Sequence, residues 1–442
     1  MLTLEWERGT VLIKGGKVDL PYVKFDERSG AFRTLAINYG KLVRYLESMG
    51  VKYVDNVMDK EQCIVKVKRE VRLRSYQKTA LDKWLARRAG IIVMPTGMGK
   101  THVGIAAIAA LRVKTLVIVP TIELIDQWVN ALGYYLDARI GKYYGGEKIE
   151  GCITVTTYDS AYISIERLGN KYPLLIFDEA HHLPSEGYRQ IAELSPAMYR
   201  LGLTATPERS DGLHQDLSSL VGPIVYRVSV EEARGLYIAD FETNLIRVNL
   251  SDAELRRYKE LMSKYREFIK RSGISFRRPS DFKALVKMSG RSKAAREALR
   301  AWREARRLAM TAPSKLDAVE EILRRHPNDR AIIFTELSDL SHEVSKRFLL
   351  PEVTYETPRE EREAVMSMFR RGDVKAIVTG KVLEEGVDVP DVNLVIILGG
   401  TSSERQYVQR IGRALRLKPD KAKIYEVVTS GTREASRRHA ST

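Results

Sequence analysis

Residues 90–101 read Gly-Ile-Ile-Val-Met-Pro-Thr-Gly-Met-Gly-Lys-Thr and decide how the rest of the chain is interpreted. An apolar run precedes the glycines and an alanine-rich segment follows them, which predicts a strand turning into a helix. Backbone N–H groups in such a turn, with the positive end of the helix dipole, favour bound phosphate. Lysine adds a charge there, and the threonine hydroxyl is a ligand for Mg²⁺. We therefore expect a nucleotide-phosphate loop made by Thr96, Gly97, Met98, Gly99, Lys100 and Thr101.

Composition indicates an intracellular globular protein. The chain has 442 residues, of which 44% are hydrophobic and 29% charged, enough for about three domains at ~150 residues each. The N-terminus lacks the apolar core of a secretory signal, and no apolar run approaches the ~20 residues of a membrane span. We therefore expect a cytoplasmic protein with no membrane contact.

The two cysteines, Cys63 and Cys152, have no second cysteine or histidine near them at metal-ligand spacing. This pattern argues against both a zinc site and a disulfide framework. We expect two free, buried thiols.

Positive charge is concentrated in one stretch. The net charge is +16, and residues 252–307 hold eighteen Lys and Arg against seven Asp and Glu, an excess of eleven. Apolar residues at helical spacing between Leu255 and Ile269 predict a helix with a buried stripe, and 291–310 predicts a second helix containing Trp302. A solvated helical hairpin is the alternative, but the local excess favours contact with a polyanion through phosphates.

The order of the remaining elements predicts an α/β protein. Residues 1–62 indicate strands followed by a helix that stops at Gly50. Buried strands separated by helices then occur in two series, which favours two parallel sheets. The expected strands are 91–93, 115–119, 153–156, 174–177 and 200–203, then 331–335, 353–355, 376–379, 394–398 and 424–428. We assign an αβ module at 1–62, an ATP-binding domain at 63–235, a linker with a basic insertion at 236–312, and a second domain at 313–442.

A second chemical motif is the apolar run 174–177 followed by Asp178, Glu179, Ala180 and His181. At the carboxyl end of a parallel strand, Asp178 can hold Mg²⁺ through water while Glu179 orients and deprotonates the attacking water. Two acids after a strand are often only a solvated turn. Together with the phosphate loop, however, they predict a nucleoside-triphosphate hydrolase that uses ATP and Mg²⁺.

The acidic motif resembles motif II of superfamily 2 DEAH-type helicases, and the other motifs of that group follow in order. The resemblance implies two RecA-like motor domains. Residues 73–77 resemble the adenine-reading element, residues 204–207 motif III, which links hydrolysis to movement, residues 379–390 motif V, and residues 409–416 motif VI, whose arginines act on the γ-phosphate. Implied nucleotide-site residues are Arg74, Gln77, Asp388, His181, Gln409, Arg410 and Arg413. Residues implied in DNA contact or coupling are Thr121, Thr157, Thr204, Ala205, Thr206, Arg209, Asp211 and Thr379.

Within that superfamily the chain is most similar to archaeal XPB helicases. The similarity rests on residues 182–184 after motif II, on 208–212 after motif III, and on the position of the basic insertion, which resembles the XPB thumb. XPB proteins usually carry Arg-Glu-Asp after motif III, whereas this chain has Arg209-Ser210-Asp211, which puts strand opening in doubt. The resemblance implies 3′–5′ movement on double-stranded or forked DNA in repair or transcription, a structure-specific nuclease as partner, and a damage-sensing role for residues 1–62.

Two alternatives stay open at this stage. The backbone-contacting motifs do not specify the sugar, so an RNA-directed helicase is one. The other is a nucleotide-switched clamp that holds DNA and recruits a nuclease without separating strands. Ser210, in place of the usual acid, keeps this second alternative open.

Overall fold

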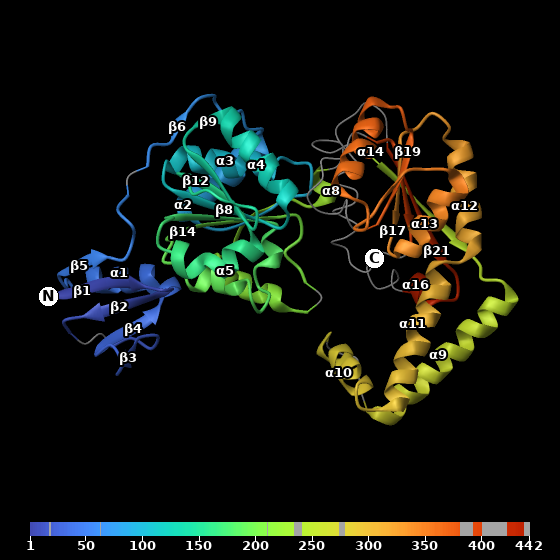
Figure 1. Cartoon of the computed structure of the whole chain (residues 1–442), viewed down its shortest axis with the longest axis horizontal. Coiled ribbons are helices and arrows are strands. Elements are labelled where there is room, and N and C mark those ends of the chain that lie inside the picture. Colours follow the sequence, from blue (N-terminus) through green and yellow to red (C-terminus); the bar gives the residue numbers. More distant parts are fainter. Residues whose placement is uncertain are drawn as a thin grey trace. The chain divides into compact units, whose positions relative to one another are not determined.

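The computed structural model describes residues 1–16, 19–61, 63–209, 211–233, 241–273, 279–380, 392–399 and 422–436. It forms two compact units, Met1–Ser229 and Val230–Thr442 (Figure 1). No helix in these described ranges is long and apolar enough to cross a membrane.

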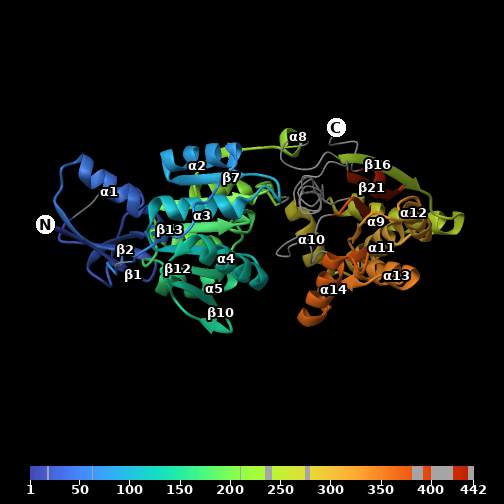
Figure 2. The same ribbon diagram turned by 90° about the horizontal axis from the view of Figure 1, so that it is seen from above.

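The N-terminal module is a five-stranded sheet with one helix packed on it, which confirms the predicted strands and helix (Figure 2). Its sheet order is β3-β4-β2-β1-β5, and β5 runs parallel to β1 because α1 intervenes before the chain returns. The elements are β1 Leu2–Glu7, β2 Thr10–Lys14, β3 Lys24–Asp26, β4 Ala31–Leu35, η1 Ala36–Asn38, α1 Tyr39–Ser48 and β5 Tyr53–Asn56.

This module is joined to the next domain by specific contacts within the first unit. Gly9 has φ +86°, and a Cβ there would lie 2.6 Å from the Cβ of Leu194, so the turn approaches α6 closely. The Asn170 side chain donates to the Val57 carbonyl at 3.1 Å, and its own carbonyl accepts from the Asp59 N–H at 3.0 Å.

The rest of the first unit has an eight-stranded sheet of order β11-β10-β12-β8-β13-β14-β7-β15, parallel except for the β10–β11 pair. Helices α5, α6 and α7 pack on one face, and α5 lies on the opposite side from α3 and α4 (Figure 1). The elements are β6 Lys66–Val67, α2 Ser75–Arg87, β7 Ala89–Val93, α3 Lys100–Leu111, β8 Thr115–Val119, α4 Ile122–Tyr135, β9 Leu136–Asp137, β10 Ile140–Tyr144, β11 Glu147–Lys148, β12 Ile153–Thr157, α5 Tyr158–Leu168, β13 Leu174–Asp178, η2 Ala180–His182, α6 Arg189–Glu193, β14 Tyr199–Thr204, η3 Leu213–Asp216, α7 Leu217–Leu220 and β15 Ile224–Arg227.

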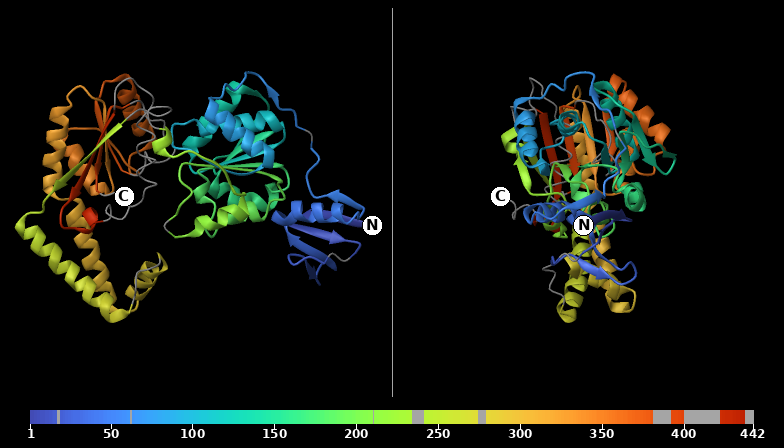
Figure 3. Two further views of the ribbon diagram at one scale, coloured as in Figure 1. Left: turned by 180° about the vertical axis from the view of Figure 1, so that it is seen from behind. Right: turned by 90° about the vertical axis from the view of Figure 1, so that its left-hand side faces the viewer.

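The second unit has an all-parallel, six-stranded sheet of order β16-β21-β20-β17-β19-β18. The two helices predicted in the basic insertion correspond to α9 and α11, which lie side by side and leave one end of the domain (Figure 3). The elements are α8 Val230–Ala233, β16 Phe241–Val248, α9 Asp252–Ser272, α10 Pro279–Ser289, α11 Lys293–Met310, α12 Pro313–Arg325, β17 Ala331–Thr335, α13 Ser338–Phe348, β18 Glu352–Val353, α14 Arg359–Arg371, β19 Ala376–Thr379, β20 Leu394–Leu398, β21 Ala422–Thr429 and α16 Arg433–Ser436.

One predicted boundary needs correction. Strand β16 falls in the range assigned to the linker and insertion, yet it pairs along its whole length with β21 and forms the edge of the second sheet. As an edge strand it buries only its two end residues, Phe241 and Val248, so it lacks the continuous apolar run that marked the other strands.

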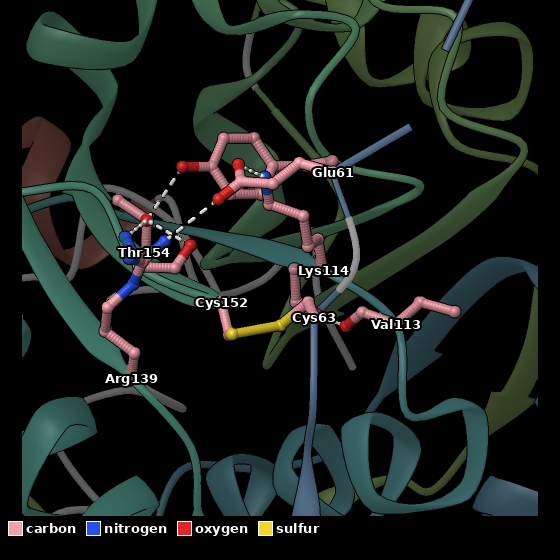
Figure 4. Close-up of a disulfide and its surroundings, with 10 residues drawn as sticks. Glu61, Cys63, Val113, Lys114, Arg139, Cys152 and Thr154 are labelled. Atoms are coloured by element: carbon pink, nitrogen blue, oxygen red, sulfur yellow. Dashed lines mark hydrogen bonds and ion pairs between the residues drawn. A yellow bond between two sulfur atoms is a disulfide. The ribbon is translucent and has the colours of Figure 1, made fainter. Parts of the chain in front are cut away.

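The prediction of two free thiols is wrong, because Cys63 and Cys152 form a disulfide (Figure 4). Their Cα atoms are 5.6 Å apart although 89 positions separate them in the sequence. Glu61 holds this segment beside the sheet by ion pairs with Lys114 at 2.5 Å and Arg139 at 3.3 Å. The pairing depends on how the chain returns to β12, which local cysteine spacing does not reveal.

Candidate nucleotide site

The motif residues of the first unit meet at one edge of its sheet because neighbouring parallel strands end there together. Val93 is level with Thr204, and Leu203 is level with Asp178. Phe177 is level with Ile118, one residue before β8 ends. The carboxyl edge of a parallel sheet is where α/β proteins bind ligands.

The phosphate loop lies between β7 and α3, as the sequence predicts. Gly97 and Gly99 have φ of +85° and +74°, and Gly99 directly precedes the first helical residue, Lys100. The Lys100 side chain is 8% exposed, and its Nζ is 3.4 Å from the Met94 carbonyl. The Thr96 hydroxyl is buried with no hydrogen-bond partner in the described chain. This donor and the left-handed glycines fit a bound phosphate.

Gln77, the predicted adenine reader, touches the phosphate loop. Its Oε1 accepts from the Arg74 N–H at 2.8 Å, and its Nε2 donates to the Met98 carbonyl at 2.8 Å. The Tyr76 hydroxyl donates to that same carbonyl at 3.0 Å. Helix α2 therefore fixes the shape of the phosphate loop. A nucleotide base in this region would meet the Gln77 amide, which the cap of α2 already orients.

Asp178 is held by an indole that sequence reasoning did not assign to the site. The Trp128 Nε1–H donates to Asp178 Oδ2 at 2.8 Å, and the Glu179 backbone N–H donates to Oδ1 at 3.0 Å. Burial, followed by the neighbouring Glu179 carboxylate, raises the pKa of Asp178 to about 6, and the indole hydrogen bond opposes this shift. A cation bound to Asp178 would offset the cost of burying its negative charge.

The position of Trp128 depends on a glycine in α3. A Cβ at Gly104 would lie 2.6 Å from Trp128 Cη2, so only glycine lets the ring reach the acidic motif. The sequence holds a weak signal for this contact. A tryptophan at a buried position of α4 needs a partner for its N–H.

Glu179 lies among the groups that would control it. Its Oε1 is 3.6 Å from Lys100 Nζ and its Oε2 is 3.5 Å from His181 Nδ1. The residue is 4% exposed and has φ +47°, a left-handed conformation that is costly outside glycine. The strained backbone turns the carboxylate back toward the phosphate loop.

His181 connects the acidic motif to the predicted motif III. Its Nδ1 is 3.1 Å from the Thr204 hydroxyl, which also donates to the Thr206 carbonyl at 3.0 Å. Ala205 is buried between these residues. A change at the acidic motif can therefore reach Thr204, at the end of β14, through one hydrogen bond and the Thr206 carbonyl through a second.

Arg209 extends this connection and binds its predicted companion. Its guanidinium donates to the His181 carbonyl at 2.6 Å and to both Asp211 carboxylate oxygens at 3.0 and 2.7 Å. The Arg209 hydrogen bond is the main cause that lowers the pKa of Asp211 to about 2. Arg209 and Asp211 thus form an ion pair that contacts His181 of motif II. Ser210, which lies between them in the sequence, is outside the described residues.

The other predicted DNA-contact threonines differ in their hydroxyl partners. Thr157 caps α5 by accepting from the Ser160 N–H at 3.2 Å, and Thr379 donates to the Val353 carbonyl at 3.0 Å. The hydroxyls of Thr121 and Thr206 are buried with no partner in the described chain. Thr121 and Thr206 therefore keep a donor for a ligand, whereas Thr157 and Thr379 use theirs internally.

Part of the predicted site is not described by the structure. Asp388 of motif V and Gln409, Arg410 and Arg413 of motif VI lie outside the described residues.

Three family models match this chain in succession. Residues 4–57 match the Xeroderma pigmentosum group B helicase damage recognition domain, residues 70–209 match the type III restriction enzyme res subunit, and residues 314–418 match the helicase conserved C-terminal domain.

Relatives cover most of the chain. It is 44% identical over 432 residues to DNA 3′-5′ translocase XPB2 of Sulfurisphaera tokodaii, covering 98% of each protein. It is 31% identical to DNA 3′-5′ helicase XPB of Mycobacterium tuberculosis, covering 82% of this chain and 62% of that protein. The Hef helicase domain of Pyrococcus furiosus has the same fold, with a TM-score of 0.52 at 19% identity, over 84% of this chain and 98% of that one.

Proposed function

The chain belongs to the XPB family, and on that premise we propose that it hydrolyses ATP to translocate 3′–5′ along double-stranded DNA. The observation that carries the proposal is the convergence of Lys100, Asp178 and Glu179 at one sheet edge, linked through His181 to Arg209. The near full-length similarity to a DNA 3′-5′ translocase supports the choice of track and polarity.

The residues of the first unit would work as follows. The loop N–H groups and the Thr96 hydroxyl orient the phosphates, and Lys100 neutralises them. Lys100 would then exchange its contact with Glu179 for one with phosphate, leaving that carboxylate able to accept a proton from water. Thr101 and Asp178 would hold Mg²⁺, which supplies charge neutralisation at the phosphates when bound.

Coupling to DNA would use the hydrogen-bonded path from His181 to Thr204 and Arg209. Movement of Glu179 or His181 during hydrolysis changes what Arg209 can bind, because its guanidinium holds the His181 carbonyl and Asp211 together. The basic insertion and the N-terminal module, which matches a damage recognition domain, would contribute further DNA contacts. A structure-specific nuclease partner and a nucleoid location belong to the same proposal and rest on the resemblance to archaeal XPB.

The deciding experiment measures ATPase activity of the whole chain alone and with duplex DNA, single-stranded DNA or duplex RNA. We expect the largest stimulation with duplex DNA, and stimulation by RNA alone would contradict the proposal. A parallel pair of assays, displacement of a bound protein from duplex DNA and displacement of a paired strand, separates translocation from unwinding. The Glu179→Gln variant serves as the hydrolysis-deficient control in both.

A further inference from the structure

A cavity of about 510 Å³ opens at the carboxyl edge of the second sheet, beside α9. Three arginines line it from three different elements: Arg247 near the end of β16, Arg266 on α9, and Arg433 after β21. Tyr258 and the hydroxyl residues Ser430 and Thr432 complete its polar lining. None of the described residues that line the cavity is acidic.

The acidic residues next to these arginines are engaged elsewhere. Glu267 follows Arg266 but pairs with Arg271 at 2.6 Å. Glu434 follows Arg433 but accepts from the fully buried Lys315 Nζ at 2.8 and 2.9 Å. Three guanidinium groups around one cavity repel one another unless an anion enters, so its charge is complementary to an anionic ligand.

A narrower neighbouring cavity shows that this imbalance is local. It is lined by Trp302, Met262 and two arginines, Arg306 and Arg433, but also by Glu336 and Glu434. Arg306 pairs with Glu336 there. The narrower cavity therefore holds an internal ion pair, whereas none of the described residues that line the larger cavity is acidic.

The chain holds the third arginine in a fixed place. The Arg433 N–H donates to the Tyr258 hydroxyl at 3.0 Å, and its guanidinium lies over the Tyr265 ring, 5.5 Å from the centroid. Glu434 also accepts from the Thr429 N–H at 2.9 Å, which ties the loop to the end of β21. A loop fixed in this way loses little conformational entropy when it binds a ligand.

We propose that this arginine cavity, formed by Arg247, Arg266 and Arg433, binds a phosphate of the DNA backbone. The inference rests on the proposed function, since it names the site at which the second unit holds the DNA along which the protein moves. Guanidinium groups match phosphate oxygens in pairs of parallel hydrogen bonds. DNA is favoured over a free phosphate because the cavity is open and lies beside α9, in the insertion that carries most of the excess positive charge. One backbone phosphate bound here would fix the register of an extended polyanion.

The test uses the whole chain with Arg247→Gln and Arg266→Gln combined, and measures duplex DNA affinity by fluorescence anisotropy across a salt series. We expect Kd at low salt to rise about tenfold and the slope of log Kd against log salt to fall by about 1. A control with Lys346→Gln and Arg370→Gln removes two exposed charges from α13 and α14. We expect it to stay within about twofold of the unaltered chain. Arg247→Lys with Arg266→Lys should restore most of the salt slope.

Three outcomes separate the possible failures. If the unaltered chain binds DNA and the Gln variant matches the control, the cavity is not a DNA site. If inorganic phosphate at constant ionic strength binds only the unaltered chain while both bind DNA equally, the cavity serves a free anion and the inference is overturned. If the unaltered chain does not bind duplex DNA at all, the proposed function itself fails.

Discussion

The two units use charge in opposite ways. In the first unit, Lys100, Asp178 and Glu179 are 8%, 6% and 4% exposed, and each has a partner within the protein. In the second unit, Arg247 and Arg266 are exposed, and none of the described residues that line their cavity is acidic. Catalytic charges work when they are desolvated and held before the reaction, whereas DNA affinity comes from exposed cations that replace counterions.

The buried catalytic charge should give the largest effect. Glu179→Gln removes the group that we propose accepts a proton from water, so kcat should fall about 10²- to 10⁴-fold while ATP affinity is kept by the intact loop. Steady-state hydrolysis and nucleotide binding by equilibrium dialysis check this. The exposed acid Glu186, changed to Gln, is the control, and equal activity of the two variants would refute the assignment of Glu179.

The disulfide should matter for the stability of the first unit. Replacing Cys63 and Cys152 together with Ser opens a cross-link that spans 89 positions, and should lower the free energy of unfolding by about 2–5 kcal/mol. Guanidinium unfolding with and without a reductant measures it. Reductant should lower the stability of the unaltered chain and leave the double variant unchanged; no response in either would mean that the bond contributes little.

Removing the hydrogen bond from Trp128 to Asp178 tests how firmly the buried charges of the first unit are held in place. Trp128→Phe keeps the ring but loses the donor to Asp178, so the Mg²⁺ concentration for half-maximal ATPase activity should rise about 10- to 100-fold. Trp84→Phe is a matched control, because it also removes a buried indole N–H bond, here to the Arg200 carbonyl at 2.9 Å. Similar Mg²⁺ responses in both variants would assign Trp128 a purely structural role.

Exposed cations of the insertion should give the smallest effect. Arg300→Gln with Arg303→Gln, on the exposed side of α11, should weaken duplex binding only a few-fold and reduce the salt slope by no more than about 2. Anisotropy titrations in parallel with the Arg247 and Arg266 variant make the comparison. A larger loss from α11 than from the cavity would place the main DNA contact on the insertion.

Residue patterns predicted the elements well where one physical signal was strong. Buried parallel strands such as 174–178 are continuous apolar runs, and the stripe on α9 follows helical spacing, so both were found. The edge strand β16 is buried only at its two ends, and it was assigned to the linker. Within the candidate site, Lys100, Asp178 and Glu179 came from motif spacing, whereas Trp128 and Gly104 did not, because their contact joins two helices and depends on packing.

The α/β class, the phosphate loop, the acidic motif, the family resemblance and the excess of positive charge could all be predicted from residue patterns, because each depends on residues close together along the chain. Contacts between distant segments became visible only in the folded protein. Folding joined Cys63 to Cys152, placed Arg209 on the His181 carbonyl, and gathered Arg247, Arg266 and Arg433 around one cavity. Such contacts are fixed by how the strands and helices pack, and spacing along the chain carries no record of that packing.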